Sequence, residues 1–238
     1  RDAEIIVAGG HGFRSRADFD TYLQPLADGL GRLLGSAPKV AASRMAVGMV
    51  SLVDWAMSLA GALSCSRTVV VIPPNAAALS DRVGAVLGPN STAIQAVPRG
   101  TGDAARASAS VLADFDGDAI VYFGDTPLIR AETLAKLFAA REAGANVALL
   151  AFRSGDPSGY GRVITDAVGS FVKVVEDRDT TPEEAKVTLC NAGALVADAK
   201  VLFNLLSMLR NDNAQQEFYL TDIPGMARAA GMRVAIVE

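Results

Sequence analysis

The chain has 238 residues, 50% of them hydrophobic, and a formal net charge of −4 at pH 7. A chain of this length and apolar content can bury a sizeable core, and α/β folds of this size often form one domain. The acidic balance offers no basic patch of the kind that grips a nucleic-acid backbone, so nucleic acid is not an expected partner. The longest apolar region, residues 40–63, is interrupted by Arg44 and Asp54, which argues against a membrane span.

The two cysteines, Cys65 and Cys190, lie far apart in the sequence and show no metal-ligand spacing. Cysteines of this kind are typical of reduced thiols, which favours a cytoplasmic protein. The sequence leaves the oligomeric state open.

Apolar runs of strand length alternate with segments of helical periodicity as far as residue 152. The predicted strands are residues 4–8, 68–72, 92–96, 119–123 and 146–152, and the predicted helices are residues 45–63, 76–87, 104–113 and 131–143. This alternation predicts an α/β fold in which a mostly parallel sheet has helices on both faces.

The pattern changes after Gly155. Two shorter strands, 159–164 and 171–176, flank a turn at 167–169 and predict an appended β-hairpin. The remaining expectations are a helix start near 181–184, a strand 194–196 interrupted by 191–193, helices at 201–209 and after Ile223, and a last strand at 233–237. No linker divides the chain, so residues 1–238 are expected to form one domain.

The predicted strand 119–123 is the candidate centre of the sheet and ends at Gly124-Asp125-Thr126-Pro127. Ligands of open α/β sheets bind outside the carboxyl ends of the strands. A carboxylate such as Asp125 is well placed there to hold Mg²⁺ against phosphate oxygens. Alternatively, Asp125 caps a helix that starts near Pro127, and this stretch alone favours the cap.

A glycine-rich loop, residues 9–15, follows the first predicted strand. Backbone N–H groups of such loops cradle phosphates, and Arg14 would add a permanently charged fork. The loop matches neither the Walker A pattern nor GxGxxG. The single histidine, His11, has no partners for a catalytic triad and is given no catalytic role. Lys39, next to Pro38, is either a point charge for phosphate or part of a surface turn.

A second loop of interest is Gly100-Thr101-Gly102, which opens a predicted helix. It offers N–H groups and a hydroxyl to a ligand. Thr101 is equally suited to be the N-cap of that helix.

Taken in order, these motifs resemble the pyrophosphorylase domain of the bacterial N-acetylglucosamine-1-phosphate uridylyltransferases. The segments that carry the resemblance are IIVAGGHGFR, PKV, QAVPRGTGDA, VYFGDTPLI, SGYGRVI, VVED, CNAGALVA and NDNAQQEFYLTDI. The resemblance covers nearly all of the chain from Thr68 onward and is patchy before it. The resemblance implies a Rossmann-like nucleotidyltransferase domain over residues 1–238, without the β-helix acetyltransferase domain of the family.

The resemblance also implies roles for the matching residues. The loop around the nucleotide would consist of Val7, Ala8, Gly9, Gly10 and Gly12. Arg14 and Lys39 would contact the phosphates. Gln95, Gly100 and Thr101 would bind the uracil base. Asp125 would bind Mg²⁺. On the sugar side, Phe123 and Gly124 would line the site, and Gly161, Glu176 and Asn191 would hold the sugar.

The implied reaction transfers UMP from UTP to N-acetylglucosamine 1-phosphate, giving UDP-N-acetylglucosamine and pyrophosphate. The attacking phosphate is already anionic, so no protein base is required. Catalysis would consist of positioning and of charge neutralisation by Mg²⁺, Arg14 and Lys39. The alternatives are a nucleotidyltransferase for another sugar 1-phosphate and a catalytically silent relative that binds nucleotide sugars.

The chain departs from the family pattern near the first loop. Phe13 and Ser15 replace a Thr and a Met, and Lys39 stands farther from Arg14 than the family spacing. A second loop, residues 26–32, has better spacing to Lys39 and would make Arg32 the phosphate-binding arginine. The strand before the first loop favours the first, because a strand aims the phosphate cradle. Members of the family carry a second metal ligand, an Asn, after the strand that corresponds to the last predicted strand here.

Overall fold

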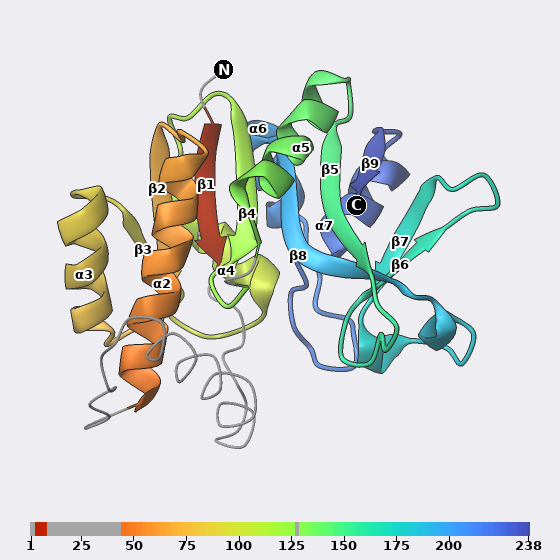
Figure 1. Cartoon of the computed structure of the whole chain (residues 1–238), viewed down its shortest axis with the longest axis horizontal. Coiled ribbons are helices and arrows are strands. Elements are labelled where there is room, and N and C mark those ends of the chain that lie inside the picture. The colour runs from red at the N-terminus through yellow and green to blue at the C-terminus, as the bar shows by residue number, and fades with distance from the viewer. Residues whose placement is uncertain (1–2, 9–43, 127–128) are drawn as a thin grey trace, which may run out of the picture.

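The computed structural model describes residues 3–8, 44–126 and 129–238, and these form a mixed sheet between two layers of helices (Figure 1). The strands of the main sheet are β1 (Ala3–Ala8), β2 (Arg67–Ile72), β3 (Thr92–Ile94), β4 (Asp118–Phe123), β5 (Val147–Arg153), β8 (Leu189–Asp198) and β9 (Val234–Val237). Their spatial order is β3-β2-β1-β4-β8-β5-β9. β8 runs antiparallel to β4 and β5, and the other neighbouring pairs are parallel.

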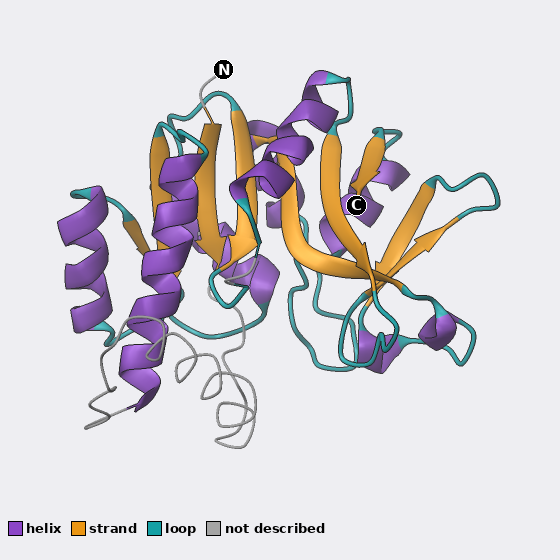
Figure 2. Cartoon of the chain, in the orientation of Figure 1, coloured by secondary structure: helices purple, strands orange, loops and turns teal. Residues whose placement is uncertain are grey.

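Helices cover both faces of this sheet, as the alternation of the sequence predicts (Figure 2). One face carries α2 (Arg44–Ala62), α3 (Ala77–Leu87) and α5 (Ala131–Glu142), and the other carries α4 (Thr101–Ala107), α6 (Ala199–Ser207) and α7 (Asp222–Ala229). The side chains of β4 alternate between the two layers: Ile120 packs with the first set of helices and Val121 with the second, and both are fully buried. β4 is therefore a central strand, as expected.

The predicted hairpin is confirmed. β6 (Arg162–Thr165) and β7 (Phe171–Val175) pair in antiparallel fashion, and β6 joins the main sheet through the pairing of Arg162 with Cys190. Figure 1 shows the hairpin projecting from one end of the sheet. The helix expected near residues 181–184 is only a 3-10 turn, Glu184–Lys186, although Thr181 and Glu184 form the reciprocal hydrogen bonds of a capping box.

One expectation about β8 is wrong. Residues 191–193 do not interrupt a strand, because β8 runs continuously from Leu189 to Asp198. The pairing with β5 shifts register between Leu149 and Ala151, which accommodates the irregular backbone of Gly193, with φ of 75°. A Cβ at Gly193 would lie 2.6 Å from Cδ2 of Phe123, so the glycine permits close packing of β8 against the end of β4.

Across the part of the chain that the structure describes, no helix has the length and apolar character needed to cross a membrane.

A largely buried ion pair fixes the start of β4. The Asp118 carboxylate accepts hydrogen bonds of 3.1 and 2.7 Å from Nε and Nη2 of Arg141, whose guanidinium also donates to the carbonyl oxygens of Ala145 and Asn146. The exposed fractions of the Arg141 and Asp118 side chains are 14% and 9%. The pair thereby joins β4 to the end of α5.

We expect Asp118→Ala to lower the free energy of unfolding by about 2–4 kcal/mol, because it leaves the Arg141 charge buried without its partner. The matched control is Asp116→Ala, which removes an exposed pair with Lys200 and should change stability by less than about 1 kcal/mol. Urea denaturation measures both, and equal effects of the two substitutions would contradict this role for the pair.

Candidate functional site

The carboxyl end of β4 presents Asp125 in a turn that Thr126 closes. The hydroxyl of Thr126 donates to the carbonyl oxygen of Phe123 at 2.7 Å. Helix α5 begins only at Ala131 and has Arg130 as its N-cap residue, so the hypothesis that Asp125 caps a helix is wrong. The half-buried Asp125 instead stands at a strand tip, where open α/β sheets bind ligands.

The end of β1 lies beside this tip. In the parallel pairing of β1 with β4, Val7 is opposite Tyr122 and Ala8 is opposite Phe123. The backbone of two predicted nucleotide-binding residues is thus adjacent to the predicted metal-binding turn. Several predicted site residues lie outside the described residues. They are Gly9, Gly10 and Gly12 of the nucleotide loop, Arg14 and Lys39 of the phosphate site, and Arg32, the alternative phosphate-binding arginine.

The second predicted loop forms the start of α4, and its N-cap residue is Gly100. Thr101 is therefore not the cap; its Oγ1 accepts a hydrogen bond of 3.0 Å from the N–H of Leu220. The N–H of Gly102, expected to face a ligand, donates to the carbonyl oxygen of Phe218 at 2.8 Å. The reason for both differences is a segment distant in sequence, residues 218–221, that lies against this turn.

Gln95 is held against the same turn. Its Nε2 donates to the carbonyl oxygen of Gly100 at 3.1 Å and to Oδ2 of Asp103 at 3.0 Å. Both partners accept hydrogen bonds and neither donates, so they determine which end of the amide faces them. The structure therefore brings Gln95, Gly100 and Thr101 together, as a shared role in base recognition requires.

The predicted sugar-binding residues also come together. The N–H of Asn191 donates to the carbonyl oxygen of Gly161 at 2.8 Å. A Cβ at Gly161 would lie 3.6 Å from each carboxylate oxygen of Glu176, so these two residues are in close proximity. Asn191 also approaches the end of β4, because its Oδ1 accepts from the N–H of Gly193, which packs on the Phe123 ring. Gly124 follows Phe123 in the turn.

Glu176 lines a pocket of about 430 Å³ between the hairpin and the segment before α7. The lining residues are Val174, Glu176, Asp179, Asp212, Asn213, Ala214, Tyr219, Thr221 and Asp222. Within it, the hydroxyl of Thr221 donates to Oε1 of Glu176 at 2.6 Å. The pocket is rich in hydrogen-bond acceptors, which suits a ligand that carries several hydroxyl groups.

Two carboxyl groups of this pocket, those of Glu176 and Asp222, have raised pKa values. Burial raises the pKa of Glu176, and the nearby charges of Asp179, Asp177 and Glu217 add to this, against the opposing hydrogen bond from Thr221. Burial, followed by the charges of Glu176, Asp212 and Asp179, raises the pKa of Asp222 to about 6. The pocket therefore changes its charge near neutral pH.

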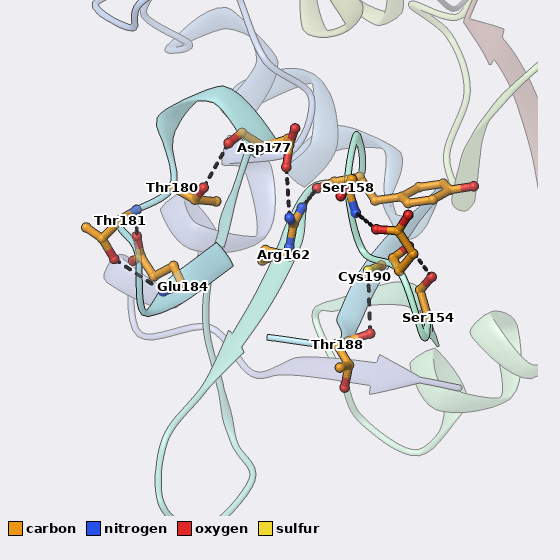
Figure 3. A network of polar contacts seen from close by, with 11 residues as sticks. Ser154, Ser158, Arg162, Asp177, Thr180, Thr181, Glu184, Thr188 and Cys190 are labelled. Atoms are coloured by element: carbon orange, nitrogen blue, oxygen red, sulfur yellow. Dashed lines mark hydrogen bonds and ion pairs between the residues drawn. The ribbon is translucent and has the colours of Figure 1, made fainter. Parts of the chain in front are cut away.

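The buried side chain of Arg162, in β6, connects the start of the hairpin to Asp177, just beyond the end of β7 (Figure 3). Nη2 of Arg162 donates to Oδ1 of Asp177 at 2.8 Å, and Nη1 donates to the carbonyl oxygen of Tyr160. Asp177 follows Glu176 and Tyr160 precedes Gly161 in the sequence. Arg162 thus fixes the neighbours of two predicted sugar-binding residues.

The sequence analysis assigns no role to Tyr219, Thr221 and Asp222, nor to the buried Asp103. Residues 211–223 resemble a family motif, but the contacts of Tyr219, Thr221 and Asp222 depend on residues far away in the sequence. For Asp103 a signal exists, since Arg99 and Arg106 stand at i−4 and i+3 on either side of it and form ion pairs with it.

No group of three or more His, Cys, Asp or Glu residues that could hold a metal ion occurs among the residues that the structure places. Asp125, at the tip of β4, is not among the residues that line the acidic pocket.

The pKa of Asp222 predicts a pH effect on stability. Because the folded-state pKa, about 6, lies above the ordinary 3.8, protonation of Asp222 stabilises the fold at low pH, and this contribution is lost as pH rises through 6. We expect Asp222→Asn to gain roughly 1–2 kcal/mol relative to the wild type between pH 4 and pH 7.5. Denaturant unfolding across this pH range measures the difference, and a constant difference would show that Asp222 titrates normally.

Comparison with known proteins identifies the family of the chain. A family model described as nucleotidyl transferase matches residues 34–237. The bifunctional protein GlmU of Maricaulis maris is 47% identical over 186 residues, which cover 78% of this chain and 41% of that protein. The bifunctional protein GlmU of Rhodospirillum rubrum is 40% identical over 240 residues, which cover 100% of this chain and 48% of that protein. The chain thus spans about half or less of the length of these curated relatives.

Solved structures agree on the fold. A UDP-glucose pyrophosphorylase in complex with UDP-glucose superposes with a TM-score of 0.64 at 16% identity, covering 100% of this chain and 90% of that one. The ligand-free form of a UDP-glucose pyrophosphorylase gives a TM-score of 0.66 at 15% identity. The fold is therefore the α/β fold of these pyrophosphorylases, and the chain belongs to the nucleotidyl transferase family.

Proposed function

We propose that this chain transfers UMP from UTP to N-acetylglucosamine 1-phosphate, with Mg²⁺, to give UDP-N-acetylglucosamine and pyrophosphate. The observation that carries the proposal is the segment 218–221, which hydrogen-bonds to the Gly100–Gly102 turn at one end and to Glu176 at the other. The segment would thereby connect the proposed base-recognition turn to the proposed sugar pocket around Glu176. The similarity to bifunctional GlmU proteins supports the choice of substrates.

Gln95 is suited to read uracil. Both N–H groups of its Nε2 donate to acceptors within the protein, so Oε1 is the atom that can accept a hydrogen bond from a ligand. Uracil carries an N–H at N3, which can donate a hydrogen bond to an amide oxygen. Backbone groups of the Gly100 turn would meet the neighbouring carbonyl oxygens of the base.

Glu176 and Asn191 are suited to hold the sugar. A carboxylate accepts hydrogen bonds from sugar hydroxyls, and the Asn191 amide offers both donors and acceptors to an acetamido group. A larger side chain at Gly161 would require movement of Val174, whose Cγ1 would lie 3.2 Å from a Cβ there.

Asp125 fits a divalent cation, because Mg²⁺ is held in phosphate sites by one or two carboxylates together with substrate phosphates and water. When bound, Mg²⁺ supplies neutralisation of phosphate charge. The protein residues bind and orient the two substrates so that the sugar phosphate oxygen faces the α-phosphorus. Arg14 and Lys39 complete the proposed phosphate contacts.

The proposed unit is residues 1–238 as one nucleotidyltransferase domain. Its nucleotide substrate implies that the reaction takes place in the cytoplasm.

The direct test is pyrophosphate release with Mg²⁺ from UTP, CTP, GTP, ATP or dTTP, with N-acetylglucosamine 1-phosphate or glucose 1-phosphate. Release should require UTP and the acetylated sugar. Asp125→Ala should lower it by roughly 10²-fold or more, because it removes the carboxylate that holds the cation. Asp116→Ala, which changes only the exposed pair with Lys200, should leave it unchanged.

Thermal unfolding of the Asp125→Ala protein serves as the folding control. Full activity of a folded Asp125→Ala protein would remove the metal assignment. A protein that binds UDP-N-acetylglucosamine but releases no pyrophosphate would be a silent relative.

A second prediction concerns the sugar pocket. Glu176→Ala should weaken binding of N-acetylglucosamine 1-phosphate by roughly 10–100-fold, because hydrogen bonds to a charged acceptor are lost, and should weaken UTP binding much less. Glu176→Gln keeps the side-chain volume and an acceptor for Thr221, so it separates loss of charge from loss of packing. Calorimetry with each ligand measures the two effects, and an equal loss of both would show that the sugar pocket lies elsewhere.

A further inference from the structure

Asp103 is a buried carboxylate in the first turn of α4, with an exposed fraction of 7%. Its Oδ2 accepts the hydrogen bond from Gln95 Nε2 at 3.0 Å. Its Oδ1 accepts from Nη2 of Arg99 at 2.9 Å and from Nη2 of Arg106 at 2.6 Å. A carboxylate between two guanidinium groups has its charge compensated, so it can remain ionised when buried.

The two arginines are themselves held in place. Their guanidinium carbons lie 5.6 Å (Arg99) and 4.7 Å (Arg106) from the centroid of the Phe218 ring, in the geometry of cation–π contacts. Burial acts to raise the pKa of Asp103, but the hydrogen bonds from Gln95, Arg106 and Arg99 outweigh it and lower that pKa below its ordinary value. The carboxylate is therefore charged at neutral pH and can only accept hydrogen bonds.

The charged Asp103 carboxylate restricts the orientation of the Gln95 amide. The amide could otherwise turn either its oxygen or its nitrogen toward Gly100 and Asp103. With Nε2 turned toward Gly100 and Asp103, both N–H groups are satisfied and Oε1 faces away. The reverse orientation would place Oε1 against a carbonyl oxygen and a carboxylate, which is repulsive. Without Asp103, only the carbonyl oxygen of Gly100 would distinguish the two orientations.

We propose that Asp103 is a positioning residue for base selection: it holds the Gln95 amide with its oxygen outward, so that the site favours a base with an N–H at N3, as in uracil, over cytosine. Cytosine has an acceptor at N3, which an outward amide oxygen repels and an outward amide nitrogen would bind. The inference rests on the proposed function and names the residue that sets one part of its specificity.

The test is the ratio of the dissociation constants of CTP and UTP, measured by calorimetry with Mg²⁺. Asp103→Ala should reduce the preference for UTP by about tenfold, because the amide is free to turn and donate to cytosine. Asp103→Asn keeps the size of the side chain but offers only one oxygen to Gln95 and the arginines, so it should also reduce the ratio. Asp114→Ala, which removes only an ion pair with Arg67, should leave the ratio unchanged.

The same substitution in a Gln95→Ala background separates positioning from a general structural effect. If Asp103 acts through Gln95, Asp103→Ala should not change the CTP-to-UTP ratio once Gln95 is absent. The inference is overturned if Asp103→Ala and Asp103→Asn weaken both nucleotides equally, or if the ratio changes as much in the Gln95→Ala background. A wild-type protein that binds UTP no better than CTP would instead overturn the proposed uridylyl transfer.

Discussion

The hydrogen bonds of residues 218–221 are the constraint on which the site depends. Phe218 donates through its N–H to the carbonyl oxygen of Arg99 and accepts from Gly102, while Leu220 donates to Thr101. Thr221 then reaches Glu176. One short segment therefore links the Gly100–Gly102 turn to the pocket around Glu176. The proposed reaction depends on positioning two substrates, and such a link would help to hold their binding sites at a fixed distance.

Close approach of segments distant in sequence explains two glycines near the site. Gly100 has φ of 109°, and a Cβ there would lie 2.6 Å from the carbonyl oxygen of Phe218. Gly193 has φ of 75° and lies against the ring of Phe123. Both positions combine a left-handed backbone with close approach of another chain segment, so any other residue would be strained as well as obstructed. The two glycines allow elements that are distant in sequence to pack closely against each other.

Local patterns in the sequence predict most of the helices and strands, but they do not predict the contacts between them. The apolar run 119–123 predicted a central strand because burial on both faces requires such a run. The roles of Thr101 and Asp125 as helix caps were wrong because capping preferences are local, whereas the partner of Thr101 is Leu220, 119 residues away. The continuity of β8 through Gly193 could not be predicted either. A glycine within a strand and a glycine that ends a strand give the same local sequence pattern, and only the pairing with the neighbouring strand distinguishes them.

The charges of the site are arranged with opposite signs at its two ends. At the base turn, Asp103 is paired with both Arg99 and Arg106, which leaves one positive charge in excess. The sugar pocket is lined by the carboxylates of Glu176, Asp179, Asp212 and Asp222. An anionic phosphate is repelled from the pocket, whereas neutral sugar hydroxyls can donate to it. The electrostatic potential of these residues therefore fits the proposed orientation of a nucleotide sugar, in which the base lies at the turn and the sugar lies among the carboxylates.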